Sequence, residues 1–60
     1  MNEHKVIRIN LQRGKREFEV TQVGQTIKTR TLEHNPYVYK VVHIDDQDIL
    51  LERGGKWRER

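Results

Sequence analysis

Apolar and polar residues alternate near the start of the chain, which is the pattern of a β-strand with one buried face. The alternating apolar residues are Ile7, Ile9 and Leu11 in a first segment, and Phe18 and Val20 in a second. Gly14 lies between the two segments and accepts the positive φ of a tight turn without strain. The first 22 residues are therefore predicted to form a β-hairpin.

Four further segments are predicted to be extended, and turn-forming residues separate them. The segments are Thr26–Leu32, Tyr37–Ile44, Ile49–Arg53 and Lys56–Arg60. The separators are a loop at Pro36, an aspartate-rich turn at residues 45–48 and a two-glycine turn at residues 54–55. The segment Tyr37–Ile44 is apolar on both faces, which is typical of a central strand covered on two sides.

This succession of short strands predicts an all-β fold. No helical period longer than one turn is evident, and 15 of the 60 residues are valine, isoleucine or threonine. These β-branched residues pack well on a pleated sheet. The expected architecture is a single domain over residues 1–60. It is a small SH3-like barrel or a barrel-like antiparallel meander of five to six short strands.

Composition narrows the range of functions. The chain has no cysteine, so neither a disulfide nor a thiolate zinc site is available. No apolar run approaches the length of a membrane span, and residues 1–5 lack the apolar stretch of a signal peptide. We expect a cytoplasmic protein without a membrane partner. The net charge of +3 is compatible with a nucleic-acid partner without requiring one.

No motif indicates catalysis, a metal or a cofactor, so a non-enzymatic binding module is expected. The chain has no serine or cysteine nucleophile, and its three histidines are far apart in the sequence. The cluster Asp45, Asp46 and Asp48 lacks the mid-loop glycine and the final glutamate of a calcium-binding loop. It is interpreted as a hairpin turn.

Aromatic and basic residues in the second half of the chain indicate a nucleic-acid-binding surface. Tyr37 and Tyr39 are two residues apart on a strand, so both rings share a face. Small β-barrels stack bases on such rings while nearby cations contact phosphates. The alternative is that the tyrosines and Trp57 are core residues. The candidate nucleic-acid-binding residues are Lys28, Arg30, Tyr37, Tyr39, Lys40, Lys56, Trp57 and Arg58.

A protein partner remains open as the second functional class. An unpaired edge strand would allow the domain to pair with another protein, or to form a homodimer. A second basic group, Arg8, Arg13, Lys15 and Arg16, surrounds Gly14. Because Glu17 and Glu19 follow at once, this group is interpreted as a solvated hairpin tip.

The sequence of turns and strands from Val23 to Arg60 also resembles a known family. The segments concerned are Val23–Ile27, Tyr39–Ile44 and Ile49–Gly55. In this order they resemble the periplasmic β-domain of inner-membrane components of bacterial type II secretion and type IV pilus systems. The resemblance covers about two-thirds of the chain and consists of general hairpin features. It implies a β fold and a role in protein interaction.

Overall fold

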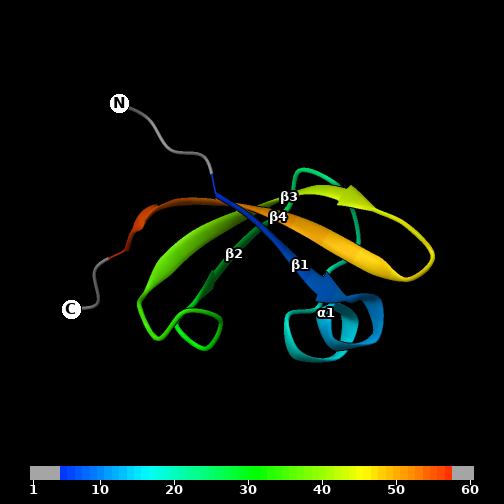
Figure 1. The fold of residues 1–60 in the computed structure, drawn as a ribbon, viewed down its shortest axis with the longest axis horizontal. Coiled ribbons are helices and arrows are strands. Elements are labelled where there is room, and N and C mark those ends of the chain that lie inside the picture. Colours follow the sequence, from blue (N-terminus) through cyan, green and yellow to red (C-terminus); the bar gives the residue numbers. More distant parts are fainter. Residues whose placement is uncertain (1–4, 58–60) are drawn as a thin grey trace.

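Residues 5–57 form a four-stranded antiparallel sheet and one short helix in the computed structural model (Figure 1). The elements are β1 (Val6–Asn10), α1 (Leu11–Glu17), β2 (Thr26–Thr29), β3 (Tyr37–Ile44) and β4 (Asp48–Lys56). The strand order is β1-β4-β3-β2. The predicted antiparallel β fold is confirmed, with four strands in place of five or six. Within these residues no helix has the length and apolar character needed to cross a membrane.

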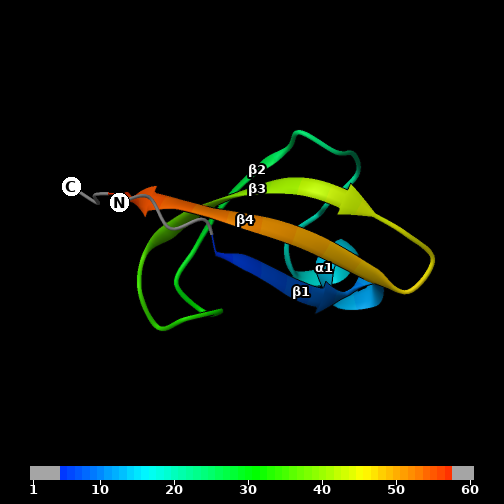
Figure 2. The same ribbon diagram turned by 45° about the horizontal axis from the view of Figure 1, so that its top comes forward.

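The sheet is open, because its two edge strands do not pair with each other. β1 pairs with β4 and β2 pairs with β3, and Figure 2 shows β1 and β2 on opposite edges. The residues described therefore do not form a closed barrel. Closure alone removes edge strands from a sheet, so β1 and β2 both retain one unpaired side.

The hydrophobic core lies on one side of the sheet, which we call the inner face. Tyr39 and Val41 of β3 and Ile49 and Leu51 of β4 are fully buried there. The remaining buried residues are Ile9, Val20 and Ile27. The predicted coverage of β3 on both sides is wrong for the described residues, because α1 packs on the inner face only.

The predicted N-terminal hairpin is also wrong, because residues 11–17 are helical. The Asn10 side chain accepts a hydrogen bond of 2.8 Å from the Gln12 backbone N–H, which caps the helix. Leu11, Gly14 and Phe18 have helical spacing and contact the core. Gly14 indicated a turn in the sequence, yet here it allows the helix to approach Ile9 and Ile49 closely.

The predicted turn at residues 54–55 is wrong as well, because β4 continues through both glycines to Lys56. A Cβ on Gly54 would lie 3.1 Å from the Val38 carbonyl oxygen, beside a register shift between β3 and β4. Gly54 thus permits close backbone approach at an irregular point of the ladder. Of the predicted last strand, Lys56 ends β4, and residues 58–60 lie outside the described residues.

The central predictions are confirmed. β2 begins at Thr26 as expected and ends earlier, at Thr29, while β3 has the predicted bounds. The aspartate-rich segment is a turn, in which Asp45 Oδ1 accepts hydrogen bonds from the backbone of Gln47 at 2.9 Å and of Asp48 at 2.8 Å. The turn residues have no partner strand for these two backbone N–H groups, so the Asp45 side chain accepts their hydrogen bonds.

The side of the sheet opposite α1, which we call the outer face, is not covered by any element among residues 5–57. Its residues alternate with the core residues along each strand, as the two-residue period requires. They are Val6, Arg8 and Asn10 of β1, Thr26 and Lys28 of β2, Val38, Lys40, Val42 and His43 of β3, and Asp48, Leu50 and Glu52 of β4.

The contact at Gly14 leads to a first prediction. A Cβ at this position would overlap Ile49 Cδ1, and Ile49 is fully buried and has little room to move. We expect Gly14→Ala to lower the free energy of unfolding by about 1–2 kcal/mol, despite the better helix propensity of alanine. Urea denaturation measures this change.

The matched control is Gly55→Ala, because nothing lies within 4 Å of a Cβ at Gly55. Its free energy of unfolding should stay within about 0.5 kcal/mol of the wild type. A Gly14→Ala variant as stable as the wild type would show that α1 does not pack tightly on Ile49.

Candidate nucleic-acid interface

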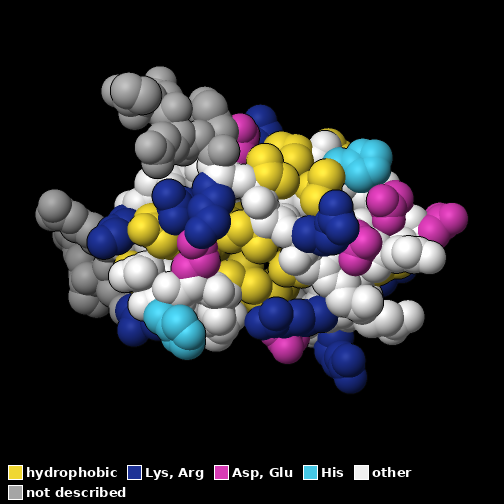
Figure 3. All heavy atoms as spheres, in the orientation of Figure 1, with side chains coloured by type: hydrophobic (Ala, Val, Ile, Leu, Met, Phe, Trp, Pro, Cys, Tyr) yellow, Lys and Arg dark blue, Asp and Glu magenta, His cyan; other side chains and the backbone are white. Residues whose placement is uncertain are grey.

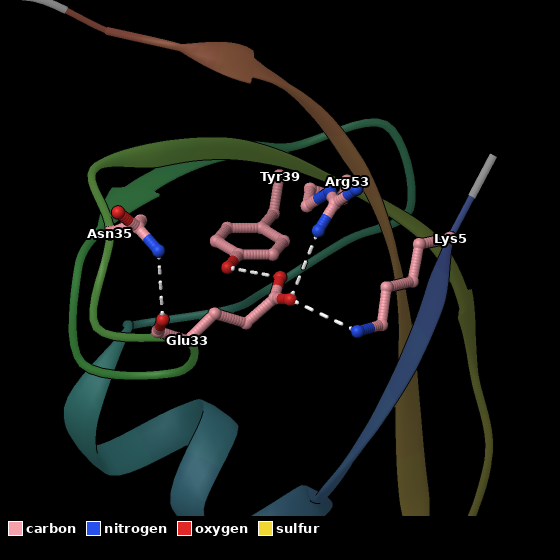
Figure 4. A network of polar contacts seen from close by, with 5 residues as sticks. All are labelled: Lys5, Glu33, Asn35, Tyr39 and Arg53. Carbon is pink, nitrogen blue, oxygen red and sulfur yellow. Dashed lines mark hydrogen bonds and ion pairs between the residues drawn. The ribbon is translucent and has the colours of Figure 1, made fainter. Parts of the chain in front are cut away.

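The β2–β3 loop carries a carboxylate that joins four parts of the chain. Glu33 accepts hydrogen bonds from Tyr39 Oη at 2.8 Å, Arg53 Nη1 at 3.1 Å and Lys5 Nζ at 3.2 Å (Figure 4). Lys5 directly precedes β1, Tyr39 belongs to β3 and Arg53 to β4. Asn35 closes the loop by donating its side-chain N–H to the Glu33 carbonyl at 3.2 Å.

Both oxygens of the Glu33 carboxylate accept hydrogen bonds, which argues against a role as a general acid or base. Burial raises the pKa of Glu33, but the hydrogen bonds from Tyr39 and Lys5 and the charges of Lys5 and Arg53 outweigh it and hold the pKa below its usual value. Burial, together with the bond to Glu33, raises the pKa of Tyr39 well above its usual value. A carboxylate kept charged and a phenol kept neutral form a structural contact.

Cations and aromatic rings gather beyond this contact, at the end of the sheet where β4 finishes. Arg53 lies 4.5 Å and Lys56 5.9 Å from the centre of the Tyr37 ring. Arg30 lies 5.9 Å from the centre of the Trp57 ring. The backbone N–H of Trp57 donates to the Pro36 carbonyl at 2.8 Å, which ties this end to the start of β3. We call Arg30, Tyr37, Arg53, Lys56 and Trp57 the basic end.

The two tyrosines share a face, as predicted, but differ in exposure. Their rings contact edge to face, with centroids 6.3 Å apart and an interplanar angle of 81°. Tyr39 is fully buried, so its ring is unavailable for stacking on a base. Tyr37 and Trp57 are partly exposed. The indole N–H of Trp57 is buried without an acceptor among the described residues, so that edge of the ring faces inward.

The remaining predicted residues lie elsewhere. Lys28 and Lys40 are exposed on the outer face, opposite Val38 and Glu52 respectively. Arg58 lies outside the described residues. The fold therefore brings Arg30, Tyr37, Lys56 and Trp57 together and separates them from the two outer-face lysines. Glu33 was not predicted as a site residue, because nothing in its local sequence indicates that Lys5, Tyr39 and Arg53 converge on it.

Acidic side chains occupy the opposite end of the molecule. Asp45 and Asp46 lie in the β3–β4 turn and Asp48 begins β4, and Figure 3 shows carboxylates gathered at this end, on the right. Backbone hydrogen bonds from Asp48 and Gln47 hold the pKa of Asp45 below its usual value, so this group stays charged. The long strands β3 and β4 thus separate the aspartates of their turn from Arg53 and Lys56.

The predicted basic hairpin tip is part of a helix instead. Arg13 pairs with Glu17 one helical turn later, at 3.0 Å, and Lys15 and Arg16 are exposed. A hollow of about 760 Å³ opens between α1 and the β3–β4 turn and has apolar residues in its lining. Its charged lining residues are one cation, Lys15, and three carboxylates, Glu19, Asp45 and Asp46, so the hollow lies at the acidic end and disfavours a phosphate.

Comparisons with known proteins leave the chain without an assigned family. No family model, no curated protein and no solved structure matches it. Among residues 5–57, no group of three histidine, cysteine or acidic side chains is arranged to hold a metal ion. The candidate site consists of two partly exposed rings, with cations from β4 and from the segment that follows β2.

The Glu33 contact yields a second prediction. Glu33→Gln keeps the shape but loses the charge that three donors share, so we expect the free energy of unfolding at neutral pH to fall by about 1–2 kcal/mol. Because the folded protein lowers the pKa of Glu33, its contribution is complete above the ordinary value of 4.5 and is lost as the pH falls through the lowered value.

Urea denaturation at several pH values tests this expectation. The difference between wild type and Glu33→Gln should narrow as the pH falls below 4.5. Glu17→Gln is the control, because Glu17 forms an exposed pair within α1 that contributes little. A gap between wild type and Glu33→Gln that does not change with pH would contradict the assigned role of the carboxylate charge.

Proposed function

We propose that this protein binds single-stranded nucleic acid through its basic end. The observation that carries the proposal is the grouping of Arg30 and Lys56 around the partly exposed rings of Tyr37 and Trp57. Single strands are bound by aromatic or guanidinium planes that stack on bases, with cations that contact the phosphates. The basic end has both kinds of group within one small area.

The separation of charge along the molecule supports this proposal. Carboxylates are concentrated at the β3–β4 turn, and the rings and their cations lie at the other end of the same strands. A polyanion would be attracted to one end and repelled by the other, which orients its approach. Arg30 beside Trp57 and Lys56 beside Tyr37 are both exposed, so these two cations are the proposed phosphate contacts.

A second candidate function is self-association through β1. The Lys5 carbonyl accepts a hydrogen bond from the backbone N–H of Arg53. Because these bonds alternate along an antiparallel strand, the backbone N–H and carbonyl groups of Val6 and Arg8 point away from β4. Val6 is 55% exposed at this edge. Sedimentation equilibrium tests this self-association. A dimer that Val6→Pro dissociates would support pairing through the β1 edge, and a monomer at all concentrations would reject it.

The nucleic-acid proposal gives a third prediction. Fluorescence anisotropy of a labelled mixed-sequence single strand, at low salt, measures the affinity. We expect Lys56→Glu to weaken binding by about tenfold, because an attraction to phosphate becomes a repulsion. The chain has a single tryptophan, so the emission of Trp57 should change as the strand binds.

The control is Lys15→Glu, an identical change of charge on α1, away from the basic end. It should weaken binding far less. The salt dependence provides a further check, because loss of one phosphate contact should reduce the slope of log K against log salt by about 0.7. No binding at low salt, or equal losses in the two variants, would reject the proposed site.

A further inference from the structure

The outer face carries more apolar surface than a solvated sheet face requires. One-sided antiparallel sheets commonly alternate apolar residues inward with polar residues outward. Here Val6 is 55% and Val42 38% exposed on the outer face, and Val38 and Leu50 are partly exposed there. Val42 lies at a register shift between β3 and β4. The next residue, His43, is opposite Leu50, and both Val42 and His43 are exposed.

Cations lie beside these apolar residues in the register of the sheet. Arg8 is directly opposite Leu50, and Lys28 is directly opposite Val38. Lys40 lies between Thr26 and Glu52, and Glu52 in turn lies opposite Val6. Three cations therefore share this face with two carboxylates, those of Glu52 and of Asp48 at the start of β4, so cations outnumber carboxylates around an apolar centre.

We propose that the outer face docks an acidic amphipathic segment of a partner protein. Val6, Val42 and Leu50 would contact the apolar side of that segment, and removal of this surface from water would supply most of the binding free energy. Arg8, Lys28 and Lys40 would lie near its carboxylates, which would steer the encounter and set the orientation.

The chemistry of the face separates this partner from two others. Two copies of the chain that met through their outer faces would bring like charges together, which is unfavourable. A nucleic acid would meet the cations but no tyrosine, because Tyr37 and Tyr39 lie on the inner side of β3. Aliphatic side chains offer no plane for bases to stack on, and they fit the leucines and valines of a protein segment.

This surface is distinct from the basic end, and the inference does not rest on the proposed function. The two sites use different residues: Arg30, Lys56 and Trp57 at the basic end, and Lys40 with Val42 at the centre of the outer face. Loss of one activity would therefore leave the other testable.

The experiment is an NMR amide-shift titration of the whole chain with two synthetic helical peptides. One has leucines on one face and glutamates on the other, and its counterpart has lysines in place of the glutamates. We expect the glutamate peptide alone to bind, with shifts concentrated in β1, β3 and β4 at outer-face residues. Lys40→Glu should weaken this binding by about tenfold, and Lys15→Glu, on α1, should have little effect.

A second variant tests the apolar contribution. Val42→Asn removes exposed apolar surface without touching the core, so it should weaken binding of the glutamate peptide while the dispersion of the spectrum is preserved. Four outcomes would overturn the proposal. The first two are equal binding of both peptides and amide shifts confined to other surfaces. The third is an equal loss of affinity in Lys40→Glu and Lys15→Glu. The fourth is displacement of the peptide by self-association, or by a single-stranded oligonucleotide that binds the outer face.

Discussion

The polar contact that connects the most distant parts of the fold is the carboxylate of Glu33 with its three donors. An open sheet of this size has little surface to bury, and a domain of 60 residues buries only about 60% of the surface of its unfolded chain. From the β2–β3 loop, Glu33 joins the residue before β1 to β3 and β4. The side chain of Tyr39 can be fully buried because its hydroxyl has this partner.

The single-sided core has a direct consequence for binding. Within residues 5–57, α1 and the loops cover only the inner face, so these residues leave the opposite face and both sheet edges accessible. A closed barrel would have hidden the edges, and a second layer of helix would have hidden the outer face. The same sparse packing that limits the stability of the domain therefore leaves most of its sheet available for partners.

Charge is distributed along the strands as well as across the sheet. β3 and β4 are long enough to keep the aspartates of their turn away from Arg53 and Lys56 at the other end. Two cations that are close in the sequence lie on different surfaces. Lys28 is on the outer face, and Arg30 lies against Trp57 at the basic end. Although the net charge is small, cations lie on two separate surfaces. They accompany aromatic rings at the basic end and aliphatic side chains on the outer face.

Local sequence determined the strands that have strong signals of their own. The β-branched and aromatic run from Tyr37 to Ile44 predicted β3 to the residue, and the aspartates after it predicted the turn, because both depend on interactions within a few residues. The shared face of Tyr37 and Tyr39 follows from the two-residue period of any strand.

Tertiary structure decided the rest. Gly14 and Gly54 both indicated turns, and each instead lies where another segment approaches closely, Ile49 in one case and the Val38 carbonyl in the other. Which tyrosine is core depends on the position of Glu33, whose partners are up to 28 residues away in sequence. Close approach and convergence of charges depend on segments that are distant along the chain, so no local pattern of residues can specify them.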